Sequence, residues 1–225
     1  MVNDLSQLER NVEEVVETLG LELEPIAVTF SDSPDERGVS RRVRVCEAFD
    51  VVRRENIIIN FSKETCVCPG GRHYAGLELL SLKAVAGVWT KTHKAYKSMD
   101  VAVTSIKKQP QPAKRGEYLI LSPLKMVEND PDMVLLFANA EQADRILGLV
   151  SFNGAEPFTY YPISNACSVI TNTLAKGRPE ISFMSWHSRP AADWSPNELI
   201  IALPFRDFKI AVNNIHNSGF GRALS

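Results

Sequence analysis

The sequence predicts an α+β fold in which helices flank one mixed β-sheet, and three observations support this class. Segments with helical apolar spacing are interspersed with short β-branched runs, without regular alternation. The 225 residues are 44% hydrophobic and 23% charged, which is ordinary for a globular protein with a substantial core. Neither an internal repeat nor a clear linker divides the chain. Residues 1–225 are therefore predicted to form a single domain.

The first half of the chain carries both helix and strand signals. Apolar side chains recur at helical spacing before Gly20, a residue that suits a helix C-cap. Two runs rich in β-branched residues indicate strands on either side of a helix that starts near Cys46. After a loop at 65–71, closely spaced apolar residues predict one long helix. In chain order, these elements are expected at residues 3–19, 25–30, 46–55, 56–61 and 73–89.

The second half contains more strands. Two apolar runs flank the polar loop at 107–116, and both are interpreted as strands. A wholly apolar run before Ala140 predicts a buried strand, and Pro204 suits the first turn of a final helix. Strands are expected at residues 99–106, 117–121, 133–138, 158–161, 180–186 and 198–203, and helices at 140–152, 165–175 and 204–214.

Charge and hydropathy exclude two classes of partner. The formal net charge of −2 does not indicate a nucleic-acid-binding protein. The longest apolar runs fall well short of the roughly 20 residues that span a bilayer. Residues 1–20 alternate in charge and contain no apolar signal-peptide core. We therefore expect a cytoplasmic protein with neither a nucleic-acid nor a membrane partner.

The four cysteines, Cys46, Cys66, Cys68 and Cys167, are the main functional candidates. They are too few for the disulfide framework of a small secreted domain, so they are expected to be thiols, metal ligands or redox centres. Each lies near the start of an expected helix, and strand-to-helix turns of one sheet often share an edge. The partial positive charge of a helix N-terminus favours thiolates. We therefore expect the four thiols to meet in one site.

Thiolates suit iron–sulfur clusters and zinc, and four cysteines match the ligand count of either. The leading hypothesis is a cysteine-ligated metal-binding protein, with an iron–sulfur cluster for redox or sensing and zinc as the alternative. One Cys-x-Cys and two distant cysteines depart from the usual spacing of Cys-x2-Cys pairs. The competing interpretation is that Cys46 and Cys167 are small buried hydrophobic residues.

A turn next to the Cys-x-Cys supplies further candidates. Gly70 and Gly71 allow a bound group to approach the backbone closely, and Arg72 and His73 are placed to contact an anion. His73 is also a candidate fourth ligand in place of Cys66, although a polar first helical turn facing water explains the same residues. Two alternatives follow: a non-catalytic module that binds a small anion, and a thiol enzyme with Cys68 as nucleophile. The partner is expected to be a small molecule or a redox partner, and no catalytic motif identifies a reaction.

Several stretches of the chain carry a family resemblance. They are Pro25-Ile-Ala-Val, the single Cys46, Cys66-Val-Cys-Pro-Gly-Gly-Arg-His-Tyr-Ala-Gly-Leu77, Pro131-Asp-Met-Val-Leu-Leu, Glu141-Gln-Ala-Asp-Arg145, Asn165-Ala-Cys167, Ser188-Arg-Pro and Glu198-Leu-Ile-Ile-Ala-Leu-Pro204. On these stretches the chain resembles the domain-of-unknown-function family 169, a set of uncharacterised prokaryotic proteins. The resemblance spans most of the chain and implies one domain. It also implies that Cys46, Cys68 and Cys167 belong to the family pattern, and it supplies no activity.

Overall fold

A six-stranded sheet organises the computed structural model, which describes residues 5–154, 165–186 and 188–222. The strand order is β2-β3-β1-β4-β6-β5, and every pair of neighbouring strands in it is antiparallel. One isolated parallel bridge joins Val39 to Ile59. The α+β class with flanking helices is confirmed. The named strands form an antiparallel sheet, whereas a mixed sheet was expected. The sequence does not predict strand direction, because side chains alternate in the same way in parallel and antiparallel strands.

The strands are short, and β3, β4 and β6 contain the most buried residues. Their bounds are β1 Ile26–Ser31, β2 Ile59–Phe61, β3 Tyr118–Pro123, β4 Met133–Ala138, β5 Glu180–Ser182 and β6 Leu199–Pro204. These positions confirm the expected strands near 25–30, 117–121, 133–138 and 198–203. The expected strand at 56–61 is confirmed only at 59–61, because Asn56 ends α2 in the left-handed conformation. The expected strand at 180–186 is confirmed only at its start. Met184 takes a positive φ of 44°, a conformation that does not continue a strand.

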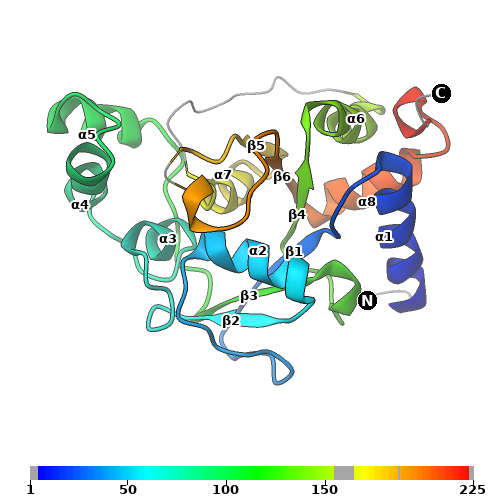
Figure 1. Cartoon of the computed structure of the whole chain (residues 1–225), viewed down its shortest axis with the longest axis horizontal. Helices are drawn as coiled ribbons and strands as arrows, with labels where there is room; N and C mark the ends of the chain where they lie inside the picture. Colours follow the sequence, from blue (N-terminus) through cyan, green and yellow to red (C-terminus); the bar gives the residue numbers. More distant parts are fainter. Residues whose placement is uncertain (1–4, 155–164, 187, 223–225) are drawn as a thin grey trace.

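Helices cover both faces of the sheet (Figure 1). The eight described α-helices are α1 Leu5–Leu19, α2 Val45–Glu55, α3 Pro69–Tyr74, α4 Leu82–Gly87, α5 Met99–Lys107, α6 Ala140–Ser151, α7 Ser168–Lys176 and α8 Phe205–Asn214. One face is covered by α1, α6 and α8, and the opposite face by α2, α3 and α7. The expected helices at 3–19, 46–55, 140–152, 165–175 and 204–214 are therefore confirmed.

Strand alternation creates two separate apolar layers. In β4, Met133, Leu135 and Phe137 face the layer that also holds α2 and α7. The intervening residues face the layer under α1, α6 and α8. Because both faces are covered, β4 is a continuous apolar run of six buried residues. Three of the four cysteines are buried in the layer on the α2 side, so that face of the sheet carries the candidate site.

The expected strand at 99–106 is wrong, because this segment is helix α5. Its valines and threonine have high β propensity, but tertiary context outweighs propensity here. Ser98 caps the helix by accepting a hydrogen bond from the Val101 amide at 3.4 Å. Ala102 and Ile106 are buried at the i, i+4 spacing of a helix face.

The single long helix expected at 73–89 is also wrong. Helix α3 ends at Tyr74, and Gly76 has a φ of +71°, which ends the helical path. A second helix then begins after Ser81, whose hydroxyl accepts a hydrogen bond from the Ala84 amide at 3.3 Å. The strand expected at 158–161 lies outside the described residues.

A helical lobe extends from one end of the molecule. It comprises α4, the π-helix at Val88–Thr92 and α5, and Figure 1 shows α4 and α5 packed beside each other, away from the sheet. Within the lobe, Val85 and Trp89 are buried. We call residues 82–107 the helical lobe.

Candidate functional site

A cavity of about 340 Å³ lies between the helical lobe and the α2 face of the sheet. We call it the thiol pocket, because three of the four cysteines line it. Its full lining is Arg44, Cys46, Val67, Cys68, Pro69, Gly70, Tyr74, Leu80, Val85, Val88, Trp89, Thr92, His93, Asn165, Cys167 and Ser188. The cysteines come from three separate parts of the chain. The expected convergence of Cys46, Cys68 and Cys167 on one cavity is therefore observed.

Cys46 is placed by the first turn of α2. The helix begins because the Arg44 amide donates a hydrogen bond to Glu47 Oε2 at 2.7 Å, which satisfies one amide at the helix start. Asn56 ends the helix in the left-handed conformation at φ 54°. Cys46 is only 8% exposed and packs in the apolar layer beside the pocket.

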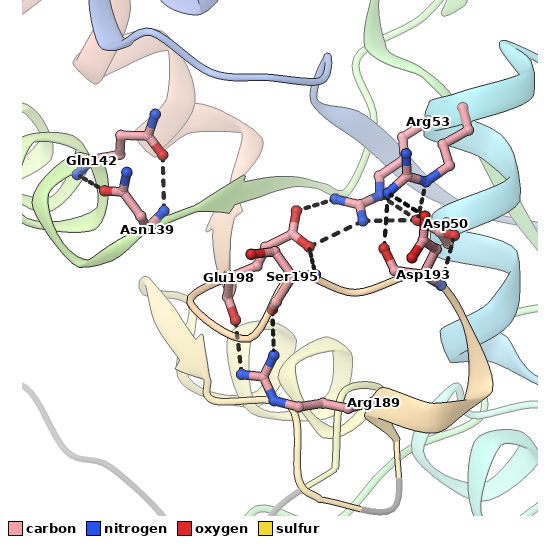
Figure 2. A network of polar contacts seen from close by, with 9 residues as sticks. Asp50, Arg53, Asn139, Gln142, Arg189, Asp193, Ser195 and Glu198 are labelled. Atoms are coloured by element: carbon pink, nitrogen blue, oxygen red, sulfur yellow. Dashed lines mark hydrogen bonds and ion pairs between the residues drawn. The ribbon is translucent and has the colours of Figure 1, made fainter.

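Helix α2 is anchored at its other end by the polar contacts of Arg53 (Figure 2), a residue whose side chain is fully buried. Its guanidinium pairs with Asp50 at 2.7 Å and with Glu198. The same group lies over the rings of Phe137 and Trp194, 4.4 and 4.2 Å from the ring centroids. Arg53 thereby fixes the helix that carries Cys46 to the segment between β5 and β6.

Cys66 and Cys68 lie in the loop that follows β2. The Val67 amide donates a hydrogen bond to the Val43 carbonyl at 3.2 Å, which holds this loop against the entry to α2. The Cys68 sulfur accepts a hydrogen bond from the Gly71 amide at 3.4 Å and caps α3. The Cys66 thiol donates to the Cys68 carbonyl at 3.5 Å. Cys66 is 2% exposed and does not line the pocket, whereas Cys68 is half-buried and lines it.

Cys167 is held by Asn165 immediately before α7. Its thiol donates a hydrogen bond to Asn165 Oδ1 at 3.0 Å, and the same oxygen accepts one from the Ser168 amide at 2.8 Å. Asn165 is 8% exposed and lines the pocket. Its side chain therefore both starts the helix and orients the thiol.

Burial and neighbouring sulfurs raise the pKa values of the three buried cysteines. Burial, followed by the charge of Cys68, raises the pKa of Cys46 to about 11. Burial is also the main reason that the pKa of Cys66 rises to about 11, and Cys68 again adds repulsion. The pKa of Cys167 is raised well above its ordinary value by burial and then by Cys68, Cys46 and Cys66. Each buried thiol is thus kept protonated at neutral pH, and the four groups lie within reach of one another's charge.

The expected ligand-binding turn contributes to the pocket in part. Gly70 lines the pocket. Gly71 serves packing, because a Cβ there would lie 3.2 Å from both Cys66 Sγ and Val45 Cγ2. Arg72 does not line the pocket, and its Nε pairs with Glu78 Oε2 at 3.1 Å.

His73, the expected alternative ligand, is 3% exposed and does not line the pocket either. Its Nδ1 accepts a hydrogen bond from the Leu80 amide at 3.1 Å. Its role in the structure is to hold the segment between α3 and α4.

The sequence reasoning missed the lobe wall of the pocket. Trp89 and His93 lie in it, with ring centroids 5.6 Å apart in an edge-on arrangement. The predicted helix at 73–89 ends at Trp89 and does not reach His93, and no sequence pattern places either residue opposite the cysteines. Arg44 was missed as well, although its position two residues before Cys46 was an available signal.

Within the ranges that the structure describes, no three His, Cys, Asp or Glu side chains stand in an arrangement that would hold a metal ion. A search of the same ranges finds no helix with the length and apolarity needed to cross a membrane.

Comparison with known proteins identifies the family. The family model for the domain-of-unknown-function family 169, described as an uncharacterised ArCR, matches residues 14–214. The chain belongs to this family. The match contains all four cysteines and every residue of the thiol pocket. Comparisons with curated proteins and with solved structures gave no match.

Proposed function

We propose that this member of family 169 binds a soft metal centre in the thiol pocket, with an iron–sulfur cluster preferred over zinc, for redox or sensing. Cys46, Cys68 and Cys167 are the ligands in this proposal, and Cys66 is a further donor behind them. The observation that carries it is the convergence of three separate chain segments, each with a thiol, on one cavity. Thiolate sulfur is the donor that both iron–sulfur clusters and zinc accept.

The donor set fits such a centre on chemical grounds. Metal binding must displace the protons of these thiols, and the bound cation then offsets the thiolate charge that burial and mutual repulsion disfavour. When bound, a cluster would supply one-electron transfer.

Ligation requires a local rearrangement. Cys66 would give up its bond to the Cys68 carbonyl, and Cys167 its bond to Asn165 Oδ1. Rotation about χ1 between staggered wells is enough to redirect a cysteine sulfur. The backbone that positions the four residues is unaffected by such rotations.

The test is metal analysis of protein purified without oxygen. Iron, sulfide and zinc are quantified, and a cluster is recognised by broad absorption near ~400 nm. Cys68→Ser should lose most of the bound metal, because a hard oxygen replaces a soft sulfur. Cys66→Ala is the matched variant, and it separates a three-cysteine site from a four-cysteine site. Absence of metal from the anaerobic parent protein, or unchanged metal in Cys68→Ser, would remove the proposal.

The presence of Arg44 in the lining favours a second candidate, a non-catalytic module that binds a small anion in the same pocket. The partial exposure of Cys68 favours a third, a thiol enzyme with Cys68 as nucleophile. Rapid modification of Cys68 by a substrate-like electrophile, with turnover, would support the enzyme. For all three candidates we place the protein in the cytoplasm, where thiols stay reduced. Alkylation of fresh lysates should find free or metal-protected thiols and no native disulfide.

A further inference from the structure

Metal binding accounts for the thiols of the pocket but not for its opposite wall. Leu80, Val85, Val88 and Trp89 form an apolar surface there, and all except Leu80 belong to the helical lobe. Thr92 and His93 continue the same wall with polar groups. A wall that is apolar along one part and polar along the next is typical of a site for a small amphiphilic molecule.

The polar part of this wall is built by an unusual backbone. Residues 88–92 form a π-helix, and the His93 amide donates to the Val88 carbonyl at 3.1 Å, an i to i−5 bond. Lys94 then takes a positive φ of 50°, which ends the helix. Short π-helical turns and left-handed residues other than glycine cost energy and are often found at functional sites. Here they bring Trp89, Thr92 and His93 onto one cavity.

Arg44 places a cation at the same cavity, on the side that carries Cys46. Its side chain is 49% exposed. Among the described residues its ion pairing is limited to Glu47, with Arg44 Nε 3.8 Å from Glu47 Oε1, beyond hydrogen-bond distance. Arg44 lies close enough to His93 to help lower the pKa of that imidazole, after the larger effect of burial. The guanidinium and the imidazole therefore share one region of the pocket.

We propose that the thiol pocket binds a small carboxylate with an apolar body. Arg44 and His93 hold the carboxylate, and Val85, Val88 and Trp89 contact the body. A guanidinium matches the two oxygens of a carboxylate with paired hydrogen bonds. The cavity of about 340 Å³ is at the small end of ligand sites, so the body is limited to one ring or a short chain. This inference rests on the second candidate function, a module that binds a small anion in this pocket, and it names the class of that anion; binding does not require the metal.

The experiment is calorimetric titration of the metal-free full chain with phenylacetate and with its neutral counterpart, phenylacetamide. Phenylacetate should bind more tightly than the amide. Arg44→Gln should weaken phenylacetate binding by roughly tenfold or more, because a charge-assisted hydrogen bond is lost. The same variant should leave amide binding unchanged. Arg42→Gln is the matched control, since Arg42 is exposed, two residues away and outside the pocket.

Further measurements place the ligand and separate this inference from the metal proposal. Bound phenylacetate should change the Trp89 emission and slow alkylation of Cys68. Cys68→Ser should keep phenylacetate binding even where it loses metal, so the two proposals can fail independently. No binding to the folded parent protein, equal losses in the Arg44 and Arg42 variants, or no effect of Arg44→Gln would overturn the inference.

Discussion

The raised thiol pKa values lead to a quantitative prediction about alkylation of the metal-free protein. Iodoacetamide reacts with the thiolate, and a pKa of about 11 leaves roughly 0.1% of Cys46 or Cys66 ionised at pH 8. An ordinary cysteine of pKa ~8.5 is about 24% ionised there, a roughly 200-fold difference. A more basic thiolate is more nucleophilic, which recovers about tenfold over this interval. Ionisation alone should therefore slow both cysteines by about 20-fold, and burial slows them further.

The assay follows each cysteine by mass spectrometry in native protein and in urea-unfolded protein. Cys68 should label first, because it is half-buried while the other three are buried. Labelling of Cys46 and Cys66 should accelerate about tenfold per pH unit between pH 8 and 10, as their thiolate fractions rise. Native rates within about threefold of the unfolded rates at pH 8 would refute the account of a desolvated, repulsive thiol cluster.

Three further predictions concern stability. Arg53→Met leaves two largely buried carboxylates without this partner, so urea titration should show a loss of about 3–5 kcal/mol; a loss below about 1 kcal/mol would contradict this role. Gly76→Ala should destabilise more than Gly20→Ala by at least ~1 kcal/mol, because both residues have positive φ but only at Gly76 would a Cβ clash, with the Ala113 carbonyl. Equal losses of unfolding free energy in the two variants would disprove the close approach of Gly76 to the Ala113 carbonyl. The pKa of Cys46 is higher in the folded protein than in the unfolded chain. The contribution of this thiol to the free energy of unfolding is therefore intact below pH 9 and is lost as the pH rises toward 11. Between pH 8 and 10.5 the parent should lose about 2 kcal/mol more than Cys46→Ala, and parallel pH profiles would exclude this effect.

The parts of the fold that the sequence predicts correctly are those where one signal dominates. Strand β4 is an uninterrupted apolar run, and α1 combines helical spacing with a glycine C-cap. The errors fall where signals compete. In α5, β-branched residues suggest a strand, while the Ser98 cap and the burial of Ala102 and Ile106 follow a helix. Only contact with the rest of the lobe decides between these signals.

Only one side of the candidate site could be predicted from the sequence. The thiol side could be predicted, because Cys46, Cys68 and Cys167 each lie at the start of a helix, and these helices cover one face of the sheet. The lobe wall could not, because its place depends on chain reversals after Tyr74 that no periodic pattern reports. In the structure, Gly76 and Ser81 mark those reversals. In the sequence, however, a single glycine or a single serine is compatible with an uninterrupted helix.

The two walls of the pocket constrain its ligand more than either wall does alone. A site that held only a structural metal would need the thiols and a dry surrounding, and would gain nothing from an arginine left half-exposed beside it. A site that held only an amphiphilic carboxylate would need Arg44 and the Trp89 wall, but no group of four thiols in mutual electrostatic contact. A metal centre on the thiol side that faces a small carboxylate on the lobe side uses every part of the lining. The order of loading then becomes informative. The buried thiols are neutral in metal-free protein, whereas a zinc ion or a cluster held by three or four thiolates carries net negative charge. Metal-loaded protein should therefore bind phenylacetate less tightly than metal-free protein.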